Sequence, residues 1–380
     1  MREIMTGNSA VVEGVILCRP KVVTAYPITP QTTIVEEISE VIGEGRLEAK
    51  FIPVESEHSA MASVAAAASC GVRVFTATSS HGLAFMHEML SWVSGARLPV
   101  VMVNVNRAVG APWSIWTEQT DSLMQRDTGW IQIYCASAQE ALDTVIQAYR
   151  LAEELRSPVM ICYDGFTISH TVEPVEVPSQ EIVDVFLPPL SMDNVMDYQD
   201  PHTFHTLAPA PYFGRFRHAA HQSVVSASEI LETIDEEFKK RIGRGYGLIE
   251  TYRDEDAELS LVAMSSIAGT AKKAVDILRD EGKKVGLVRQ RLFRPSPERA
   301  LKEAFEGKKI AILDRDLSSG MGGILAQEIK AVLWSIKKRP EVHEFIVGLG
   351  GQDVTIEMIC SIADQALTEP SNQGPIWVGI

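Results

Sequence analysis

Pro53-Val54-Glu55-Ser56-Glu57-His58-Ser59 joins a β-prone run, Phe51 to Val54, to an Ala-rich helical run, Met61 to Cys70. Both acids of this stretch therefore lie at a predicted strand-to-helix junction. In an open α/β sheet, the carboxyl ends of parallel strands face the crevice in which ligands bind. An acid at this place can contact a ligand, so we take the junction as the centre of the predicted site.

Strands and helices alternate on both sides of this junction. Apolar, β-prone runs predict strands at residues 21–25, 51–54, 72–78, 99–105 and 158–163, and the segments between them predict helices at residues 7–18, 32–42, 57–70, 83–94 and 137–155. Strands separated by helices of about ten residues or more are typical of βαβ units. We therefore predict a doubly wound, mainly parallel α/β domain for residues 1–170.

The alternation stops at about residue 171. Residues 171–223 are rich in proline, with aromatic and histidine residues interspersed. Long irregular segments in compact proteins are usually functional or contact a partner. We interpret residues 171–245 as an extended linker arm that crosses the surface or reaches another subunit, ended by a helix from about 227 to 241. The four histidines of the arm lack metal-ligand spacing and predict surface or interface positions: His202, His205, His218 and His221.

Residues 246–380 carry a second α/β pattern. Strands are predicted at residues 259–264, 284–289, 309–313 and 343–347, each followed by a helix. One of its turns, Ser318-Ser319-Gly320-Met321-Gly322-Gly323, is Gly-rich and precedes a helix, where phosphates can bind. The turn matches neither the GxGxxG pattern nor the P-loop lysine pattern. Turn and packing glycines are therefore the preferred interpretation.

The composition is that of an ordinary globular protein. The chain has 380 residues, of which 46% are hydrophobic and 22% charged, which is enough for two domains with large cores. The formal net charge of −15 argues against binding to nucleic acid or to an anionic membrane, because such proteins carry a basic face. No run is long and apolar enough to span a bilayer, and no secretory signal is found, so we expect a cytoplasmic protein.

The five cysteines are scattered along the chain without CxxC spacing. Several lie in apolar runs, where a free thiol behaves as a small buried hydrophobic group. We expect reduced core cysteines rather than disulfides, and no zinc or iron–sulfur site in this chain.

Three side chains at predicted strand ends suggest a site for an anion beside a cofactor. In Tyr26-Pro27-Ile28-Thr29-Pro30, two prolines stiffen the loop that presents Thr29. Arg107 ends the strand at 99–105, and its guanidinium is suited to a carboxylate. Glu57, at an apolar helix start, would be partly desolvated and could pair with a protonated ring nitrogen.

Simpler interpretations of the same residues stay open at this point. Arg107 could form a salt bridge with Asp121 or Asp127, and Glu57 could cap its own helix. The spacing of the residues alone does not separate these interpretations from a ligand site.

Six blocks carry a resemblance to a known family: Tyr26-Pro27-Ile28-Thr29-Pro30, Val54-Glu55-Ser56-Glu57-His58-Ser59-Ala60, Phe75-Thr76-Ala77-Thr78-Ser79-Ser80, Asn106-Arg107-Ala108, Gln125-Arg126-Asp127-Thr128-Gly129-Trp130 and Ser169-His170-Thr171-x-Glu173-Pro174. Together they resemble the α subunit of 2-oxoacid:ferredoxin oxidoreductases, and most of all the pyruvate enzyme (pyruvate synthase). The resemblance is in register over about residues 5–190 and looser toward the C-terminus.

The resemblance implies a pyrimidine-type thiamine diphosphate-binding domain followed by a domain like the C-terminal domain of transketolase. It also implies that thiamine diphosphate lies between this chain and a β subunit that supplies the diphosphate and Mg²⁺ site and a 4Fe-4S cluster. This chain would then bind no metal itself. Further implied partners are γ- and δ-type subunits, ferredoxin, coenzyme A and a 2-oxoacid.

The resemblance also assigns roles to residues. Glu57 matches the glutamate that binds N1′ of the aminopyrimidine, and Thr29 and Arg107 match the residues that hold the substrate carboxylate and ketone. Further cofactor contacts are expected at Pro27, Ile28, Ser80 and His81, where many relatives carry Gln in place of His81. A plain turn histidine is the alternative for His81. Substrate-pocket candidates that follow Arg107 are Trp113, Trp116 and Glu118.

The implied reaction is the reversible oxidative decarboxylation of pyruvate with coenzyme A to acetyl-CoA, CO₂ and reduced ferredoxin. Another 2-oxoacid is the first alternative: phenylglyoxylate, a branched-chain 2-oxoacid, 2-oxoglutarate or oxalate, although Thr29 argues against oxalate. A non-catalytic assembly subunit is the second alternative, and the presence of Thr29, Glu57 and Arg107 argues against it.

Overall fold

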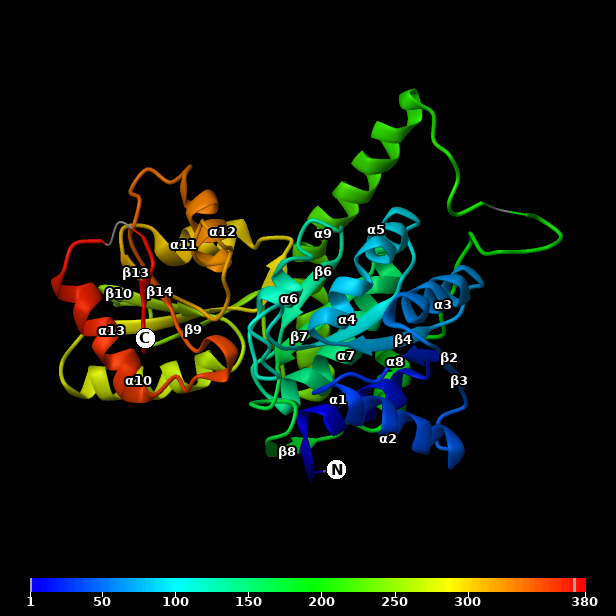
Figure 1. Ribbon diagram of the computed structural model, residues 1–380, viewed down its shortest axis with the longest axis horizontal. Helices are drawn as coiled ribbons and strands as arrows, with labels where there is room; N and C mark the ends of the chain where they lie inside the picture. Colours follow the sequence, from blue (N-terminus) through cyan, green and yellow to red (C-terminus); the bar gives the residue numbers. More distant parts are fainter. Residues whose placement is uncertain (1, 202, 372–373) are drawn as a thin grey trace.

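The computed structural model describes residues 2–201, 203–371 and 374–380. Two α/β halves lie side by side, and a long helix rises from the N-terminal half (Figure 1). A separate antiparallel pair joins β1 (Arg2–Thr6) to β8 (Val172–Glu176). Within the described ranges, no helix has both the length and the apolar character needed to cross a membrane.

The N-terminal half contains the predicted doubly wound sheet. Its seven strands lie in the order β12-β6-β7-β5-β4-β2-β3, and all neighbours are parallel except β12 with β6. The strands are β2 (Val22–Ala25), β3 (Lys50–Pro53), β4 (Val74–Thr78), β5 (Val101–Asn106), β6 (Ile131–Tyr134), β7 (Val159–Asp164) and β12 (Leu292–Arg294). The chain adds β3 on one side of β2 and β4 on the other. The strand order therefore reverses between β2 and β4, the place where open α/β sheets bind ligands.

Helices cover both faces of this sheet. One face packs on α1 (Gly7–Cys18), α2 (Thr32–Gly43) and α7 (Ala138–Leu155), and the other on α3 (Glu57–Ser69) and α5 (His87–Gly95) (Figure 1). The predicted start of the helix at residues 83–94 is wrong. The structure has α4 (Ser80–Phe85) followed by α5, so a helix begins directly after β4 and brings Ser80 and His81 to the crevice. A short helix, α6 (Thr120–Leu123), precedes β6.

The C-terminal half confirms the second α/β pattern. Its six strands lie in the order β15-β14-β13-β10-β11-β9, with only β9 antiparallel to its neighbour. They are β9 (Ile249–Tyr252), β10 (Leu259–Ala263), β11 (Val285–Gln290), β13 (Lys309–Asp314), β14 (Glu341–Ile346) and β15 (Ile376–Trp377). The helices are α10 (Ile267–Asp280), α11 (Glu298–Phe305), α12 (Ile324–Leu333) and α13 (Ile356–Thr368), with a 3-10 turn η1 (Leu349–Gly351).

The segment between the halves has more regular structure than its composition predicts. It contains β8, α8 (Gln180–Phe186) and the 33-residue helix α9 (Ala210–Ile242), which begins well before the predicted start near 227. The prolines at 209 and 211 mark the first turn of α9, where proline is tolerated because the N–H that it lacks has no helical partner. Residues 187–201 and 203–209 form the irregular part, and His202 lies outside the described residues.

The two halves are joined by a strand and by buried ion pairs. β12 belongs in sequence to the C-terminal half, but it completes the N-terminal sheet beside β6. Next to it, Arg289 and Arg291 donate to the carboxylate of Glu140 in α7, with distances of 2.8 Å and 2.9 Å. All three side chains are almost fully buried. Glu140 lies in the N-terminal turn of α7, which Ser137 caps by accepting the N–H of Glu140 at 3.1 Å.

Asp164, the last residue of β7, is a second buried link between the halves. It accepts hydrogen bonds from the N–H and hydroxyl of Ser266 at 3.0 Å and 2.5 Å, and from Arg315 Nη1 at 3.1 Å. Thr117 and Gln119 of the N-terminal half donate to its other oxygen. Burial raises the pKa of Asp164, but the charge of Arg315 and these hydrogen bonds outweigh it and hold the pKa below its ordinary value.

We predict that Asp164→Asn lowers the free energy of unfolding by about 3 kcal/mol, because Arg315 keeps a buried charge without its carboxylate. Urea unfolding followed by circular dichroism measures the loss. Because the folded state keeps Asp164 charged, its stabilisation is present above the ordinary aspartate pKa and is lost as the pH falls through the lowered value.

Asp184→Asn is the matched control, since Asp184 pairs with Arg19 at 3.0 Å on the surface. Exposed pairs contribute at most about 1 kcal/mol. Equal losses of stability in the two variants would contradict the importance of the Asp164 link.

Candidate active site

The predicted site residues gather at the carboxyl ends of β2, β4 and β5. Thr29 follows β2, Ser80 and His81 follow β4, and Arg107 follows β5. Glu57 is the first residue of α3. These elements flank the point where the strand order reverses, so the structure brings together residues that lie up to 78 positions apart in the sequence.

Glu57 is buried, with 8% of its surface exposed, and it does not cap its own helix. The cap of α3 is Ser56, whose hydroxyl accepts the N–H of Ser59 at 3.2 Å. The carboxylate of Glu57 makes no side-chain hydrogen bond or ion pair within the described part of the chain. A buried carboxylate in this state is available to a ligand that carries a donor.

Gly82 makes the space that the Glu57 carboxylate occupies. A Cβ atom at residue 82 would lie 2.6 Å from Glu57 Oε1 and 2.6 Å from the Thr78 hydroxyl oxygen. That hydroxyl is itself buried and has no partner among the described residues. A free carboxylate and an unpaired hydroxyl therefore share one cradle, which only glycine leaves open.

Arg107 is buried, with 6% exposed, and its guanidinium makes no ion pair with any described carboxylate. Nη1 donates to the carbonyl oxygen of Thr29 at 2.7 Å, Nη2 lies 3.5 Å from His81 Nδ1, and Nε has no partner. Burial lowers the pKa of Arg107 and the charge of Asp121 opposes this, but a guanidinium stays protonated. The site thus holds a positive charge that forms no salt bridge with a described carboxylate.

Asp121 contacts Arg107 through the backbone and not through a salt bridge. It accepts the N–H of Arg107 at 3.2 Å. It also accepts the N–H of Ser80 at 2.9 Å and the side-chain amides of Asn104 and Asn106 at 3.0 Å and 2.7 Å. Burial raises the pKa of Asp121, and these hydrogen bonds only partly offset it. Sequence reasoning missed this role, although two asparagines in an apolar strand were a signal for it.

The loop after β2 is fixed by hydrogen bonds between its backbone and two side chains. Gln31 Oε1 accepts the N–H of Ile28 at 3.2 Å, and Asn8 donates to the carbonyl of Pro30 at 2.8 Å. Thr29 is exposed and precedes a cis proline. Its carbonyl oxygen binds Arg107. Ile28 is half-buried and Pro27 is exposed beside it.

His81 links Arg107 to the loop that follows it. Its Nε2 accepts the N–H of Gly110 at 3.0 Å. Its neighbour Ser80 donates to the carbonyl of Ala108 at 2.5 Å, and Ala108 closes the loop by donating to the carbonyl of Trp116 at 2.9 Å. Ser80 and His81 therefore help to fix the position of the loop that follows Arg107.

The two tryptophans of this loop take different places. Trp113 is 70% exposed, and its ring centre lies 5.9 Å from Arg107 Cζ. Trp116 packs on Phe166 with ring centres 4.5 Å apart, and its side chain lies against Gly351 of the C-terminal half. Glu118 is half-buried, and burial raises its pKa. Of the three pocket candidates, the described contacts place only Trp113 directly beside Arg107.

Comparison with known proteins identifies the family. Residues 13–236 match the family model described as "Pyruvate flavodoxin/ferredoxin oxidoreductase, thiamine diP-bdg". Residues 257–359 match "Pyruvate:ferredoxin oxidoreductase core domain II". The chain belongs to the 2-oxoacid:ferredoxin oxidoreductase family. Its first half is the thiamine diphosphate-binding domain of that family.

Relatives with two different names match over nearly the whole chain. The pyruvate synthase subunit PorA of Methanothermobacter thermautotrophicus is 45% identical, covering 100% of this chain and 98% of its own. The ketoisovalerate oxidoreductase subunit VorA of Pyrococcus horikoshii is 47% identical, covering 96% of this chain and 93% of its own. The predicted 2-oxoacid:ferredoxin oxidoreductase family is confirmed. The sequence identities are too similar to distinguish between the substrates for which the two relatives are named, pyruvate and ketoisovalerate.

Solved structures show the same fold. The 2-oxoglutarate:ferredoxin oxidoreductase from Magnetococcus marinus superposes with a TM-score of 0.77 at 20% identity, covering 97% of this chain and 65% of that chain. A split gene transketolase superposes with a TM-score of 0.57 at 15% identity over 96% of this chain. The predicted thiamine diphosphate-type fold with a transketolase-like second half is thereby confirmed.

The residues present fit an aminopyrimidine. Its ring nitrogen and amino group need a buried acceptor and a polar neighbour, and the Glu57 carboxylate and the Thr78 hydroxyl, for which Gly82 leaves room, provide them.

We predict that Gly82→Ala weakens thiamine diphosphate binding about tenfold or more, because a Cβ at this position must displace the Glu57 carboxylate. Isothermal titration of the purified protein, assembled with its partner chains, measures the affinity. Gly95→Ala is the control, since a Cβ at residue 95 has nothing within 4 Å. Unchanged affinity in Gly82→Ala would remove this cradle from the cofactor site.

Proposed function

We propose that this chain is the catalytic α subunit of a multi-subunit, thiamine diphosphate-dependent 2-oxoacid:ferredoxin oxidoreductase that acts on pyruvate. The products are acetyl-CoA, CO₂ and reduced ferredoxin, and the reaction is reversible. The proposal is carried by two buried charged groups at the same end of the sheet, the Glu57 carboxylate and the Arg107 guanidinium. Neither forms a salt bridge with a described residue.

Each residue has a distinct part in the proposed mechanism. When bound, thiamine diphosphate supplies a nucleophilic carbon and an electron sink for decarboxylation. Glu57 holds a proton at N1′ of the aminopyrimidine, and burial keeps competing water away from this hydrogen bond. Pro27, Ile28, Ser80 and His81 line the crevice on the cofactor side. Arg107 and the Thr29 hydroxyl bind the carboxylate and ketone of the 2-oxoacid.

Partner chains complete the proposed enzyme. The diphosphate and Mg²⁺ site and the 4Fe-4S clusters are assigned to a β subunit and to γ- and δ-type subunits, and electrons leave to ferredoxin. Within the described residues, no group of His, Cys, Asp or Glu side chains is arranged to hold a metal ion.

A branched-chain 2-oxoacid is the second candidate substrate. The ketoisovalerate relative is as similar to this chain as the pyruvate synthase relative. Trp113 lies beside Arg107, so its indole would contact the substrate side chain and is the element that we expect to set its size.

We predict that Glu57→Gln lowers turnover by about 10²-fold or more in the assembled complex, because an amide cannot hold the N1′ proton as a carboxylate does. Turnover is measured as coenzyme A-dependent reduction of a viologen, and subunit content is measured on the same sample. Glu55→Gln is the matched control, since Glu55 lies two residues earlier and is exposed.

Normal turnover of Glu57→Gln would overturn the assignment of Glu57. A wild-type complex that binds thiamine diphosphate but reduces nothing with any 2-oxoacid would instead support an assembly subunit.

We predict that Arg107→Ala raises KM and lowers kcat/KM for every 2-oxoacid in a panel, by an amount equivalent to about 1.5–3 kcal/mol, because all of them present the carboxylate. The panel contains pyruvate, 2-oxoisovalerate, phenylglyoxylate, 2-oxoglutarate and oxalate. Arg46→Ala is the control, since Arg46 is exposed on the surface.

The wild-type panel decides between the substrates. The highest kcat/KM is expected with pyruvate. A higher kcat/KM with 2-oxoisovalerate than with pyruvate would establish the second candidate. An unchanged KM in Arg107→Ala would remove Arg107 from the substrate site.

A further inference from the structure

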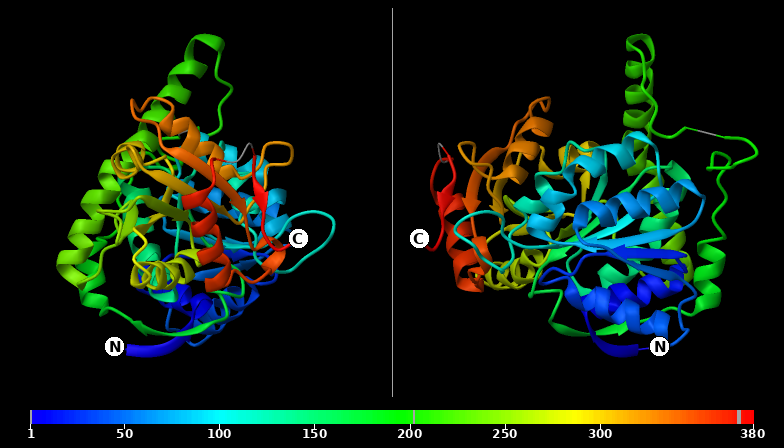
Figure 2. Two further views of the ribbon diagram at one scale, coloured as in Figure 1. Left: turned by 90° about the vertical axis from the view of Figure 1, so that its left-hand side faces the viewer. Right: turned by 45° about the vertical axis from the view of Figure 1, so that its right-hand side comes forward.

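The loop that follows Arg107, residues 108–119, connects the site with the C-terminal half. It starts at the end of β5 and extends to the C-terminal half, where the side chain of Trp116 lies against Gly351 (Figure 2). Ala108 donates to the carbonyl oxygen of Trp116 at 2.9 Å and so closes the loop at its base. Trp116 thus takes part both in the closure of the loop and in its contact with the C-terminal half.

The closed part of this loop carries Trp113. Its ring centre lies 5.9 Å from Arg107 Cζ, and its indole is the group that we expect to contact the side chain of the substrate. Trp113 and Trp116 are three positions apart in one closed loop, so a displacement of Trp116 also moves Trp113. The position of Trp116 therefore bears on the size of the 2-oxoacid that fits beside Arg107.

Gly351 leaves the space that the Trp116 side chain occupies. A Cβ atom at residue 351 would overlap Trp116 Cβ and lie 2.8 Å from Trp116 Cγ, which is far too close for non-bonded carbon atoms. Gly351 also donates its N–H to the carbonyl oxygen of Thr117 at 3.1 Å. In the N-terminal half, the Trp116 ring packs on Phe166. Trp116 is thus held between the two halves, and a side chain at residue 351 would push it out of this place.

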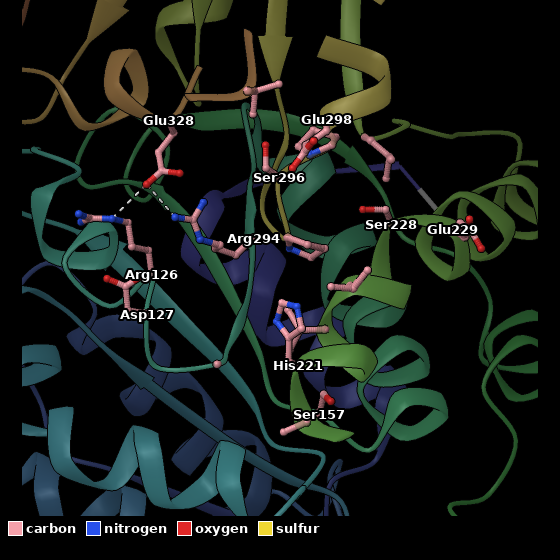
Figure 3. Close-up of a pocket in the computed structure, with 18 of the residues that line it drawn as sticks. Arg126, Asp127, Ser157, His221, Ser228, Glu229, Arg294, Ser296, Glu298 and Glu328 are labelled. Atoms are coloured by element: carbon pink, nitrogen blue, oxygen red, sulfur yellow. Dashed lines mark ion pairs between the residues drawn. The ribbon is translucent and has the colours of Figure 1, made fainter. Parts of the chain in front are cut away.

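The two halves do not depend on Gly351 to stay together. β12 and the buried carboxylates described above already join them. In addition, Arg126 and Arg294 both bind Glu328 of α12, at 3.2 Å and 2.7 Å, in the cleft shown in Figure 3. A change at Gly351 should therefore displace the loop and leave the halves joined.

We propose that Gly351 is a positioning residue of the substrate site, through which the C-terminal half sets the size of the 2-oxoacid that the site accepts. Gly351 makes room for Trp116, Trp116 closes the loop, and the closed loop holds Trp113 beside Arg107. This role in selectivity rests on the proposed function, because Trp113 contacts the substrate only if the carboxylate of a 2-oxoacid binds Arg107.

Gly351→Ala in the complex assembled with its partner chains tests this role, and Gly350→Ala is the matched control. Both residues lie in η1 and have a positive φ, +82° and +61°, so an alanine strains the backbone at either position. Apart from its chain neighbours, the atom nearest to a Cβ at residue 350 is Ser114 Oγ at 3.6 Å, an ordinary contact. The two variants therefore differ in the collision with Trp116.

Gly351→Ala is expected to raise the ratio of kcat/KM for 2-oxoisovalerate to kcat/KM for pyruvate about tenfold, because a loop displaced at Trp116 restricts a larger side chain less. The change is expected in KM and not in kcat, since Trp113 would contact the substrate side chain and not the reacting atoms. Gly350→Ala is expected to keep the wild-type ratio. A ratio that does not rise in Gly351→Ala, or that rises equally in Gly350→Ala, would overturn the role in selectivity.

A double variant separates the collision from a general effect of backbone strain. Trp116→Gly removes the side chain that a Cβ at residue 351 would meet. In the Trp116→Gly background, Gly351→Ala is therefore expected to change the ratio no further. An equal rise in the two backgrounds would show that Gly351 does not act through Trp116.

Hydrogen exchange of the same complexes measures the loop without any substrate. Gly351→Ala is expected to speed exchange in peptides that cover residues 108–119 about tenfold, because the Ala108 N–H loses its bond to Trp116 when the loop is displaced. Peptides that cover β5 should exchange as in the wild type and show that the fold is intact. Wild-type exchange of residues 108–119 in Gly351→Ala would overturn the positioning role.

The two measurements also separate this role from the proposed function. A wild-type complex that turns over no 2-oxoacid would contradict the proposed function and the role of Gly351 in selectivity. The exchange rates would then still decide whether Gly351 positions the loop.

Discussion

The Asp164 carboxylate is the contact on which the geometry of the molecule depends. It ends β7, an inner strand of the N-terminal sheet, and it binds Ser266 and Arg315 of the C-terminal half as well as Thr117 and Gln119 of the loop that follows Arg107. The C-terminal half thus fixes the loop that follows Arg107, although it supplies none of the proposed site residues. A change at this junction should therefore alter the site without touching a ligand.

Asp121 and Asp164 show two ways to bury a carboxylate. Asp164 has a cationic partner and a lowered pKa, whereas Asp121 is held by N–H donors and has a raised one. The difference matters for the site, because Asp121 binds Arg107 through the backbone and forms no salt bridge with its guanidinium. A cation held in this way is preorganised for an anion and needs no rearrangement when the anion binds.

The sequence predicts what depends on local pattern. Alternating strands and helices predict the sheet, and the junction at Glu57 and the strand end at Arg107 follow from it. The role of Asp121 depends on partners up to 41 positions away, and the two asparagines of β5 are its one signal in the sequence. β12 pairs with a strand far from it in sequence, so no local signal predicts that pairing. The start of α9 was mispredicted because prolines in a first helical turn have the composition of a linker.

The Gly-rich turn before α12 bears on where the diphosphate of the proposed cofactor binds. Asp316 and Asp314 accept the N–H groups of Ile324 and Ala326 at 2.6 Å and 3.3 Å, so carboxylates of the chain occupy this helix N-terminus. Burial raises the pKa of Asp316 to about 7. Gly323 is required because a side chain there would overlap Asp314. These carboxyl groups already occupy the N–H donors that a phosphate would need at this turn, which supports a diphosphate site on the proposed partner chain.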